Sequence, residues 1–412
     1  METSGEFYMA TLSDVPSESF RLSMLINDKR YRAYTFQFIA LMLLIGAFSY
    51  LGYNLIINLR EAGLNISYKF LGDPAGYDIN QRLIEYDNRS THWRASVVGA
   101  LNTLLVAFLG CITATIIGVT VGILRLSNNW IVSKLMAVYV EIFRNVPVLI
   151  WILIIMAIFT AVLPQPKEFR GANATASMVA DSFAFTKRGF YSPKPVFNDG
   201  SGIVIGVFVL SIFAMVYYRR YAKKALFERG QLMPTFLPSL AIFFVPSILF
   251  FFVMGQPISL DYPALKGFNF QGGIYMRASL ISLWFALSIY TAAFIAENVR
   301  AGILSVSSGQ TEAAASLGLR PNRIMNLVVL PQALRVIIPP LISHFLNLTK
   351  NSSLAIAVGY MDLTGTLGGI TLNQTGRAIE TILLLMAFYL IISLSISAIM
   401  NVYNNSVKLQ ER

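Results

Sequence analysis

The chain has 412 residues, of which 55% are hydrophobic and only 13% are charged, with a formal net charge of +11. Soluble domains carry roughly 25% charged residues, so this composition excludes an ordinary soluble domain and predicts a polytopic membrane protein. The single cysteine, Cys111, excludes an internal disulfide framework, and the two histidines, His92 and His344, are too far apart to suggest a metal site. We attribute the positive charge to basic residues in cytosolic loops rather than to nucleic-acid binding.

Apolar runs long enough to cross a membrane recur along the whole chain, and we count about eight of them. They occupy residues 34–58, 96–124, 136–163, 202–218, 236–254, 274–298, 333–358 and 378–402. Basic residues precede the first run and no small-residue cleavage pattern follows it, so we expect an uncleaved span with a cytosolic N-terminus. An even number of spans returns the C-terminus to the cytosol.

The polar segments between the runs follow this topology. The densest basic cluster lies between the fourth and fifth runs and is expected in the cytosol: Arg219, Arg220, Lys223, Lys224 and Arg229. Residues 359–377 are expected to form a Gly-rich external turn. The segment 307–331 falls on the same side of the membrane as the basic cluster.

Residues 307–331 read SSGQTEAAASLGLRPNRIMNLVVLP and contain no run long enough to span. Ser307 and Gln310 form a capping-box pattern before a helix with three successive alanines. Gly318 falls where the chain leaves that helix in a left-handed conformation, and Pro321 occupies a first-turn position of a second helix. The sequence predicts two short helices joined by a tight turn, with a small-residue face open to a partner. A hairpin that only links two spans is the alternative.

Charged residues also lie within or beside the spans, where each needs a partner or a water-filled path. Glu141 and Arg144 are three residues apart on one helix face, so we expect them to form a structural ion pair before Pro147. We interpret Asn102 and Thr103 as satisfied polar residues, since a threonine hydroxyl can bond to its own helix backbone.

Two further polar groups are candidates for a substrate pathway. Ser288 and Thr291 share one face of the sixth span. Asn351, Ser352 and Ser353 interrupt the seventh span after a double proline, and such segments are tolerated where the backbone lines a cavity. Hydrogen bonding between helices is the alternative role for both groups.

These segments together resemble the permease subunits of ABC-type importers of polar or general L-amino acids, the type I importers. Glu312-Ala313-Ala314, Gly318 and Leu330-Pro331 resemble the coupling-loop signature of that family, with Val328 where the family usually has Ile. Three more segments resemble the family in the expected order: FRNVPVL from Phe143, YTAAFIAENVR from Tyr290 and KNSSLA from Lys350.

The resemblance implies an all-α fold with a five-helix permease core. The core would comprise residues 96–163 and 274–403, the latter including a cytosolic coupling loop at 299–332. The remaining parts would be a cytosolic N-terminal segment, an extra span with its external loop, an insertion with two spans and external loops, and a cytosolic tail: 1–33, 34–95, 164–273 and 404–412.

The resemblance also implies the partners of the chain. A coupling surface of Glu312, Ala313, Ala314, Gly318, Leu330 and Pro331 would contact a cytosolic dimer of ABC ATPases. A second permease subunit, of a different sequence, would complete the pathway in the bacterial inner membrane, and an extracytoplasmic amino-acid-binding protein would deliver substrate. The sequence has no G-x-x-x-x-G-K-[ST] loop, so ATP would bind to the ATPases, and we expect no cofactor or metal on this chain and no nucleic-acid partner.

Two other classes of protein remain as alternatives. An ion-gradient-driven secondary transporter would need carboxylates within the spans and an internal repeat, and neither is evident. A polytopic membrane enzyme would need an acid–base or metal site on one face of the membrane, for which His92 with Asp87 and Glu85 is the one external candidate.

Overall fold

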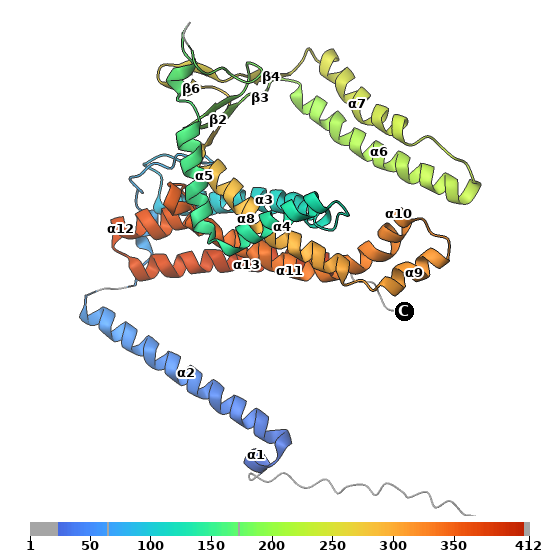
Figure 1. Cartoon of the computed structure of the whole chain (residues 1–412). Helices are drawn as coiled ribbons and strands as arrows, with labels where there is room; N and C mark the ends of the chain where they lie inside the picture. Colours follow the sequence, from blue (N-terminus) through green and yellow to red (C-terminus); the bar gives the residue numbers. More distant parts are fainter. Residues whose placement is uncertain (1–23, 64–65, 172–173, 408–412) are drawn as a thin grey trace, which may run out of the picture. The chain divides into compact units, whose positions relative to one another are not determined.

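The computed structural model describes residues 24–63, 66–171 and 174–407 of the chain. The chain divides into two compact units, Met1–Ser67 and Tyr68–Arg412 (Figure 1). In the first unit, the short helix α1 (Met24–Asn27) precedes the long helix α2 (Lys29–Glu61). Most of the predicted cytosolic N-terminal segment, residues 1–23, lies outside the described residues, as do residues 408–412 of the predicted tail.

The described residues include eight helical stretches that are long and apolar enough to cross a membrane, which confirms the predicted number. These stretches are Tyr31–Glu61, His92–Leu124, Val148–Phe169, Ser201–Arg229, Phe236–Val253, Ala278–Leu304, Pro321–Val358 and Ala378–Asn405. Each of them differs from the predicted run at one end or both, and for two of them the local structure explains the shifted start.

The core of the second unit forms where α3 (His92–Leu124) packs on α8 (Ala278–Leu304). Glycine makes their close approach possible: a Cβ added at Gly118 would lie 2.7 Å from the Cβ of Ile295 and 3.0 Å from the carbonyl oxygen of Ala292. Two further helices, α5 (Val148–Val162) and α11 (Leu330–Asn351), pack against α8. α8 is therefore the central helix of the unit.

The predicted span 136–163 is wrong at its start, because the chain forms two helices there. α4 (Trp130–Asn145) ends before the extended residue Val146, and α5 begins after Pro147. Proline lacks an N–H donor and disfavours helical backbone at the residue before it, so the break falls at this dipeptide. The membrane-length stretch consequently begins at Val148.

The insertion, predicted as external loops around two spans, also contains β-structure. Its described part and the four residues after it form three small antiparallel sheets with the strand orders β1-β2-β7, β3-β4 and β5-β6. The strands are β1 (Ala184–Thr186), β2 (Gly189–Ser192), β3 (Lys194–Phe197), β4 (Ile258–Asp261), β5 (Ala264–Lys266), β6 (Asn269–Gln271) and β7 (Ile274–Arg277). Because residues 274–277 pair with β2, the helix predicted to start at residue 274 starts at Ala278.

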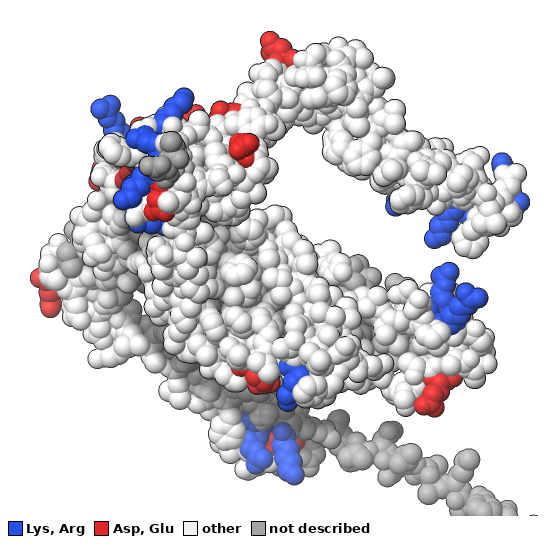
Figure 2. Space-filling model, turned by 45° about the horizontal axis from the view of Figure 1, so that its top comes forward, with Lys and Arg blue, Asp and Glu red and all other residues white. Residues whose placement is uncertain are grey.

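Between β3 and β4, α6 (Ser201–Arg229) and α7 (Phe236–Val253) form an antiparallel hairpin that extends from the strands as an arm (Figure 1). Figure 2 shows Lys and Arg at the end of the unit that carries the strands and again at the opposite end, with mostly uncharged surface between. The basic turn of the hairpin and the segment after α8 lie at this same opposite end (Figures 1 and 2).

Residues 359–377, predicted as a Gly-rich external turn, are instead largely helical and well packed. The 3₁₀-helix η4 (Ser352–Val358) continues α11, and the π-helix η5 (Thr364–Thr371) and α12 (Leu372–Thr375) lead to α13 (Ala378–Val407). Glycines here allow tight packing rather than a loose turn.

This segment packs on the N-terminal half of α3, and the polar pair of α3 bonds to it. The Asn102 amide donates to the carbonyl oxygen of Met361 at 2.8 Å, and Thr103 Oγ1 accepts from the Leu363 N–H at 3.1 Å. A Cβ at Gly99 would lie 2.1 Å from Thr366 Oγ1. The Asn102 amide nitrogen and the Thr103 hydroxyl are thus bonded by a segment about 260 positions away rather than by their own helix, whereas Asn102 Oδ1 is buried without a hydrogen-bond partner in the described structure, so Asn102 is satisfied only in part.

Candidate functional site

The first candidate site is residues 307–331, which we call the coupling segment. It comprises α9 (Ser308–Ser316), α10 (Pro321–Ile324) and the π-helix η3 (Met325–Val329). Gly318 has a φ of +77° and Pro321 begins α10, as predicted from the sequence. Ser307 occupies the N-cap position but makes no capping hydrogen bond with its side chain, so the predicted capping box does not form.

One face of α9 holds the coupling segment to the protein, and the other face is open. Ala314 is buried and packs in a small cluster with Ile324 and Val329. Glu312 and Ala313 are exposed, and Leu317 next to the turn is 81% exposed. An exposed leucine beside small side chains is a suitable surface for a protein partner.

The coupling segment continues directly into α11 through η3. Leu330 and Pro331 are the first two residues of α11, Leu330 exposed and Pro331 half-buried. This continuity links the exposed turn to the interior of the unit without an intervening loop.

The second candidate site is a hollow of about 310 Å³ between α8 and α11, which we call the inner hollow. Its lining residues are Tyr290, Thr291, Phe294, His344, Asn347 and Asn351. It brings together Thr291 and Asn351, two of the predicted pathway residues. On α11 the polar lining residues follow one another at spacings of three and four, a helical periodicity that the sequence analysis did not use.

The other three predicted pathway residues do not line this hollow. The hydroxyl of Ser288 donates to the Trp284 carbonyl oxygen at 2.6 Å, and those of Ser352 and Ser353 donate to carbonyl oxygens three residues earlier. These hydroxyls are therefore hydrogen-bonded to nearby backbone carbonyl groups.

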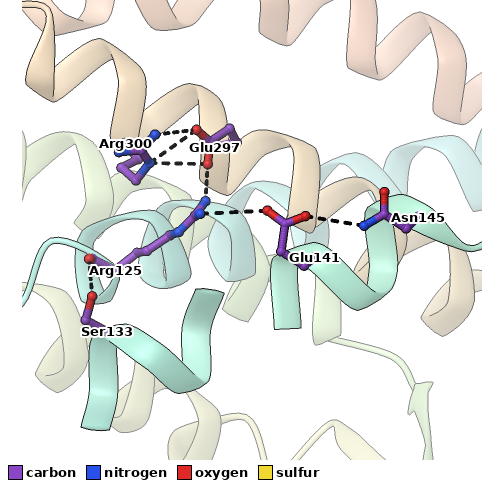
Figure 3. Close-up of polar contacts among 6 residues, drawn as sticks. All are labelled: Arg125, Ser133, Glu141, Asn145, Glu297 and Arg300. Atoms are coloured by element: carbon purple, nitrogen blue, oxygen red, sulfur yellow. Dashed lines mark hydrogen bonds and ion pairs between the residues drawn. The ribbon is translucent and has the colours of Figure 1, made fainter. Parts of the chain in front are cut away.

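Four charged residues, which we call the charge cluster, connect α3, α4 and α8 just before the coupling segment (Figure 3). Arg125 at the end of α3 forms an ion pair with Glu297, and the side-chain exposures of the two are only 16% and 24%. Glu297 also accepts from Arg300 Nη2 at 2.6 Å, and Glu141 lies 4.0 Å from Arg125. The sequence analysis did not predict a contact between Arg125 and Glu297.

The structure gives Glu141 a different partner from the predicted one. Its ion pair is with Arg125, and its carboxylate also accepts from the Asn145 amide at 3.3 Å. The guanidinium of Arg144 instead lies 5.4 Å from the ring centroid of Phe294, which lines the inner hollow. The helix spacing of three residues allowed the predicted pair, but a cation from another helix and an aromatic face offer these side chains alternative partners.

The residues considered for an enzymatic site have separate structural roles. His92 is buried, and its Nδ1 lies 3.1 Å from Thr371 Oγ1. The Asp87 carboxylate accepts from Ser90 Oγ at 2.8 Å, and this bond holds the pKa of Asp87 below its usual value. In the described parts of the chain, no group of three or more His, Cys, Asp or Glu side chains is arranged to hold a metal ion.

Known proteins share sequence with this chain over most of its length. Residues 202–408 match the family described as "Binding-protein-dependent transport system inner membrane component". The chain is 51% identical to the "Glutamate/glutamine/aspartate/asparagine transport system permease protein BztB" of Rhodobacter capsulatus, over 98% of this chain and all of that protein. It is 44% identical to the "General L-amino acid transport system permease protein AapQ" of Rhizobium johnstonii, over 96% of each. It is also 43% identical to the "Putative amino-acid ABC transporter permease protein YhdX" of Escherichia coli, over 95% of this chain and 98% of that protein.

Proposed function

The chain belongs to the inner membrane components of binding-protein-dependent transport systems, the permeases of ABC importers, and from this premise we propose that it carries L-amino acids inward, driven by separate ATPase subunits. It is an integral inner-membrane protein. Family membership gives no support to a secondary transporter or a membrane enzyme. The relatives named for amino-acid transport support the substrate class.

The observation that carries this proposal is the geometry of the coupling segment. α9 is fixed by the buried Ala314 and exposes Glu312, Ala313 and Leu317 beside the left-handed turn at Gly318. The continuous helix from Pro321 to Val358 then runs from this turn to the inner hollow. A partner that moves the turn would therefore move one wall of the hollow, as a two-state transport mechanism requires.

The remaining partners follow from the same reading. An ATPase dimer binds the coupling segment, so the two termini and the basic end of α6 face the cytosol, and the strands face outward. A second permease chain of different sequence completes the pathway, and a binding protein docks on the outer face, where the insertion helps to seat it. ATP is hydrolysed on the ATPase subunits and not on this chain.

A substitution at Gly318 tests the coupling role. A Cβ there would meet no atom within 4 Å, so Gly318→Asp leaves the packing intact and affects only the turn and its exposed surface. At a φ of +77° an ordinary L-residue is strained by about 1–2 kcal/mol, and asparagine is tolerated better than most. We expect Gly318→Asp to insert and assemble with the second permease but to separate ATP hydrolysis from uptake.

Gly318→Asn is the matched control, because it keeps the shape of aspartate without the charge. Uptake and ATPase activity are measured on complexes reconstituted in liposomes. Uptake by Gly318→Asp equal to that of the wild type would remove the basis for the coupling role.

Co-purification tests the partner set. A tagged copy of this chain should bring down an ATPase and a second permease, and a binding protein loaded with amino acid should stimulate ATP hydrolysis by the reconstituted complex. Purification of this chain alone, with no ATP-dependent uptake after reconstitution, would contradict the proposed function.

A further inference from the structure

The structure contains a second hollow, at the opposite end of α8 from the coupling segment, which we call the outer hollow. It has a volume of about 600 Å³. Its lining residues come from the 68–91 loop, α5, the insertion, β7, the start of α8 and the end of η4, and they include Lys187, Arg188, Asn269, Arg277, Ala278 and Ser279. None of these residues was a predicted pathway residue.

The lining of the outer hollow is basic. Lys187, Arg188 and Arg277 line it, and neither Asp nor Glu is among its described lining residues. Within the described residues, these three side chains have no carboxylate within ion-pair distance, and the Arg188 guanidinium donates to the carbonyl oxygen of Phe268 at 3.3 Å. Three cations around one cavity, without a countercharge, create a positive potential that attracts anions.

Neutral donors and the backbone add to this potential. Ala278 and Ser279, which line the hollow, are the first two residues of the 27-residue helix α8, and the N-terminus of a helix favours negative charge. The Tyr191 hydroxyl donates to Asn269 Oδ1 at 2.9 Å, so the amide nitrogen of Asn269 remains as a donor. The cavity thus combines charge with groups that hydrogen-bond to a carboxylate.

The outer hollow is placed to receive a substrate on its way inward. Ser279 of the outer hollow and Thr291 of the inner hollow are twelve residues apart on α8, or about 18 Å at the rise of an α-helix. Gly359 lines the outer hollow and Asn351 lines the inner hollow, and η4 connects these two residues. Between them α8 packs on η4 within the main core, and this packing separates the two hollows.

We propose that the outer hollow is a binding site for the carboxylates of acidic amino acids, which it selects as they leave the binding protein and before they reach the inner hollow. This inference rests on the proposed function. Every amino acid carries an ammonium and a carboxylate, so a cluster of cations attracts one end and repels the other. An acidic amino acid has a second carboxylate and a net negative charge, so the cluster favours it over its neutral amide.

L-glutamate and L-glutamine are suitable probes, because they are nearly equal in shape and differ by one charge. Saturation-transfer NMR on the permease complex in nanodiscs, without binding protein, measures contact with each amino acid. We expect Lys187→Gln and Arg277→Gln each to reduce the glutamate signal about two- to fivefold, as for a partly exposed charge, with little change for glutamine. Lys194→Gln on the exposed strand β3 is the matched control, because Lys194 does not line the hollow.

Uptake by the reconstituted complex gives the second readout. The ratio of glutamate to glutamine uptake should fall about two- to fivefold in the same variants and keep its wild-type value in Lys194→Gln. Equal glutamate and glutamine signals in the wild type, or signals unchanged in the variants, would overturn the site even where uptake supports the proposed function.

A third set of results would indicate that the three cations bind carboxylates of the binding protein and not those of the substrate. In that case the variants would need more binding protein for half-maximal ATPase stimulation, equally with both amino acids, and the NMR signals would not change. A different result would separate the two proposals. If the wild-type complex imports neither amino acid but the variants still lose the glutamate NMR signal, the binding site would be supported and the proposed transport function contradicted.

Discussion

The α6–α7 hairpin and the central helix α8 are both apolar enough to cross a membrane, yet only one of them is buried. In its most apolar stretch α8 is 67% buried, whereas the more hydrophobic α7 is 6% buried. The buried face of α8 is rich in small side chains such as Ala286, Ser288 and Ala292, while α7 exposes large ones such as Phe252. Lipid is as apolar as leucine, so hydrophobicity does not bury a helix in a membrane, but close packing does.

The largest test of this contrast compares two leucines. Leu283 on α8 is fully buried and Leu210 on α6 is 66% exposed. Leu283→Ala should lower the free energy of unfolding by about 2–5 kcal/mol, because it leaves a cavity in the core. Leu210→Ala should change it by less than about 0.5 kcal/mol. Detergent-denaturation midpoints of the two variants measure the difference, and equal losses would show that the hairpin is buried by a partner.

A second test uses a carboxyl group buried in the packed segment after η4. Asp362 is fully buried, and burial raises its pKa to about 6, although hydrogen bonds from the Gly365 N–H and the Tyr389 hydroxyl oppose the shift. The folded state therefore holds this proton more tightly than the unfolded state, whose pKa is near 4, and stability falls as pH rises between these two values.

Asp362→Asn removes this titration. Relative to the wild type, the variant should gain stability from about pH 4 to about pH 6, by at most roughly 3 kcal/mol, and keep a constant difference above that range. Thermal midpoints across this pH range provide the measurement. The exposed Asp87, whose pKa is lowered, is the control, since Asp87→Asn should show no such gain. If the stability difference between Asp362→Asn and the wild type did not change with pH, the raised pKa of Asp362 would be contradicted.

The smallest test compares ion pairs in the two regions. Arg125 and Glu297 are mostly buried, whereas Lys224 and Glu228 on α6 are 69% and 59% exposed. Arg125→Gln leaves the Glu297 carboxylate with one cation fewer and should cost about 1–2 kcal/mol, while Lys224→Gln should cost less than about 0.5 kcal/mol. A double-mutant cycle with Glu297→Gln isolates the Arg125–Glu297 term, and a coupling energy near zero would mean that the charge cluster does not hold α3 to α8.

The sequence predicted the membrane-spanning helices well because hydrocarbon thickness imposes their length and composition. It did not predict the break before Pro147 as the end of a helix, since the apolar run continues through it. It also missed the burial of residues 359–377, because glycine and threonine suit an exposed turn as well as a tight helix packing. β2 pairs with β7, which follows it only after two intervening helices. Strands with such distant partners leave no local pattern in the sequence.

The coupling segment was the part of the candidate site that the sequence described best. Its Ala-rich helix, left-handed glycine and first-turn proline are local features, and each depends on its neighbours in the chain. The charge cluster and the two hollows depend on distant segments. Spacing of three residues suggested that Glu141 pairs with Arg144, whereas folding brings Arg125 to Glu141 from the end of α3.

The helical path from Pro321 to Asn351 is unbroken, so a small tilt at the coupling segment would produce a larger displacement at the far end of the path. Asn351 lies thirty residues after Pro321, so at 1.5 Å per residue the path is about 45 Å long, and a tilt of only about 5° at one end displaces the other by about 4 Å. Such a displacement exceeds the diameter of a water molecule. If an ATPase subunit binds the coupling segment as proposed above, a small rotation of that subunit is thus enough to displace one wall of the inner hollow by this distance.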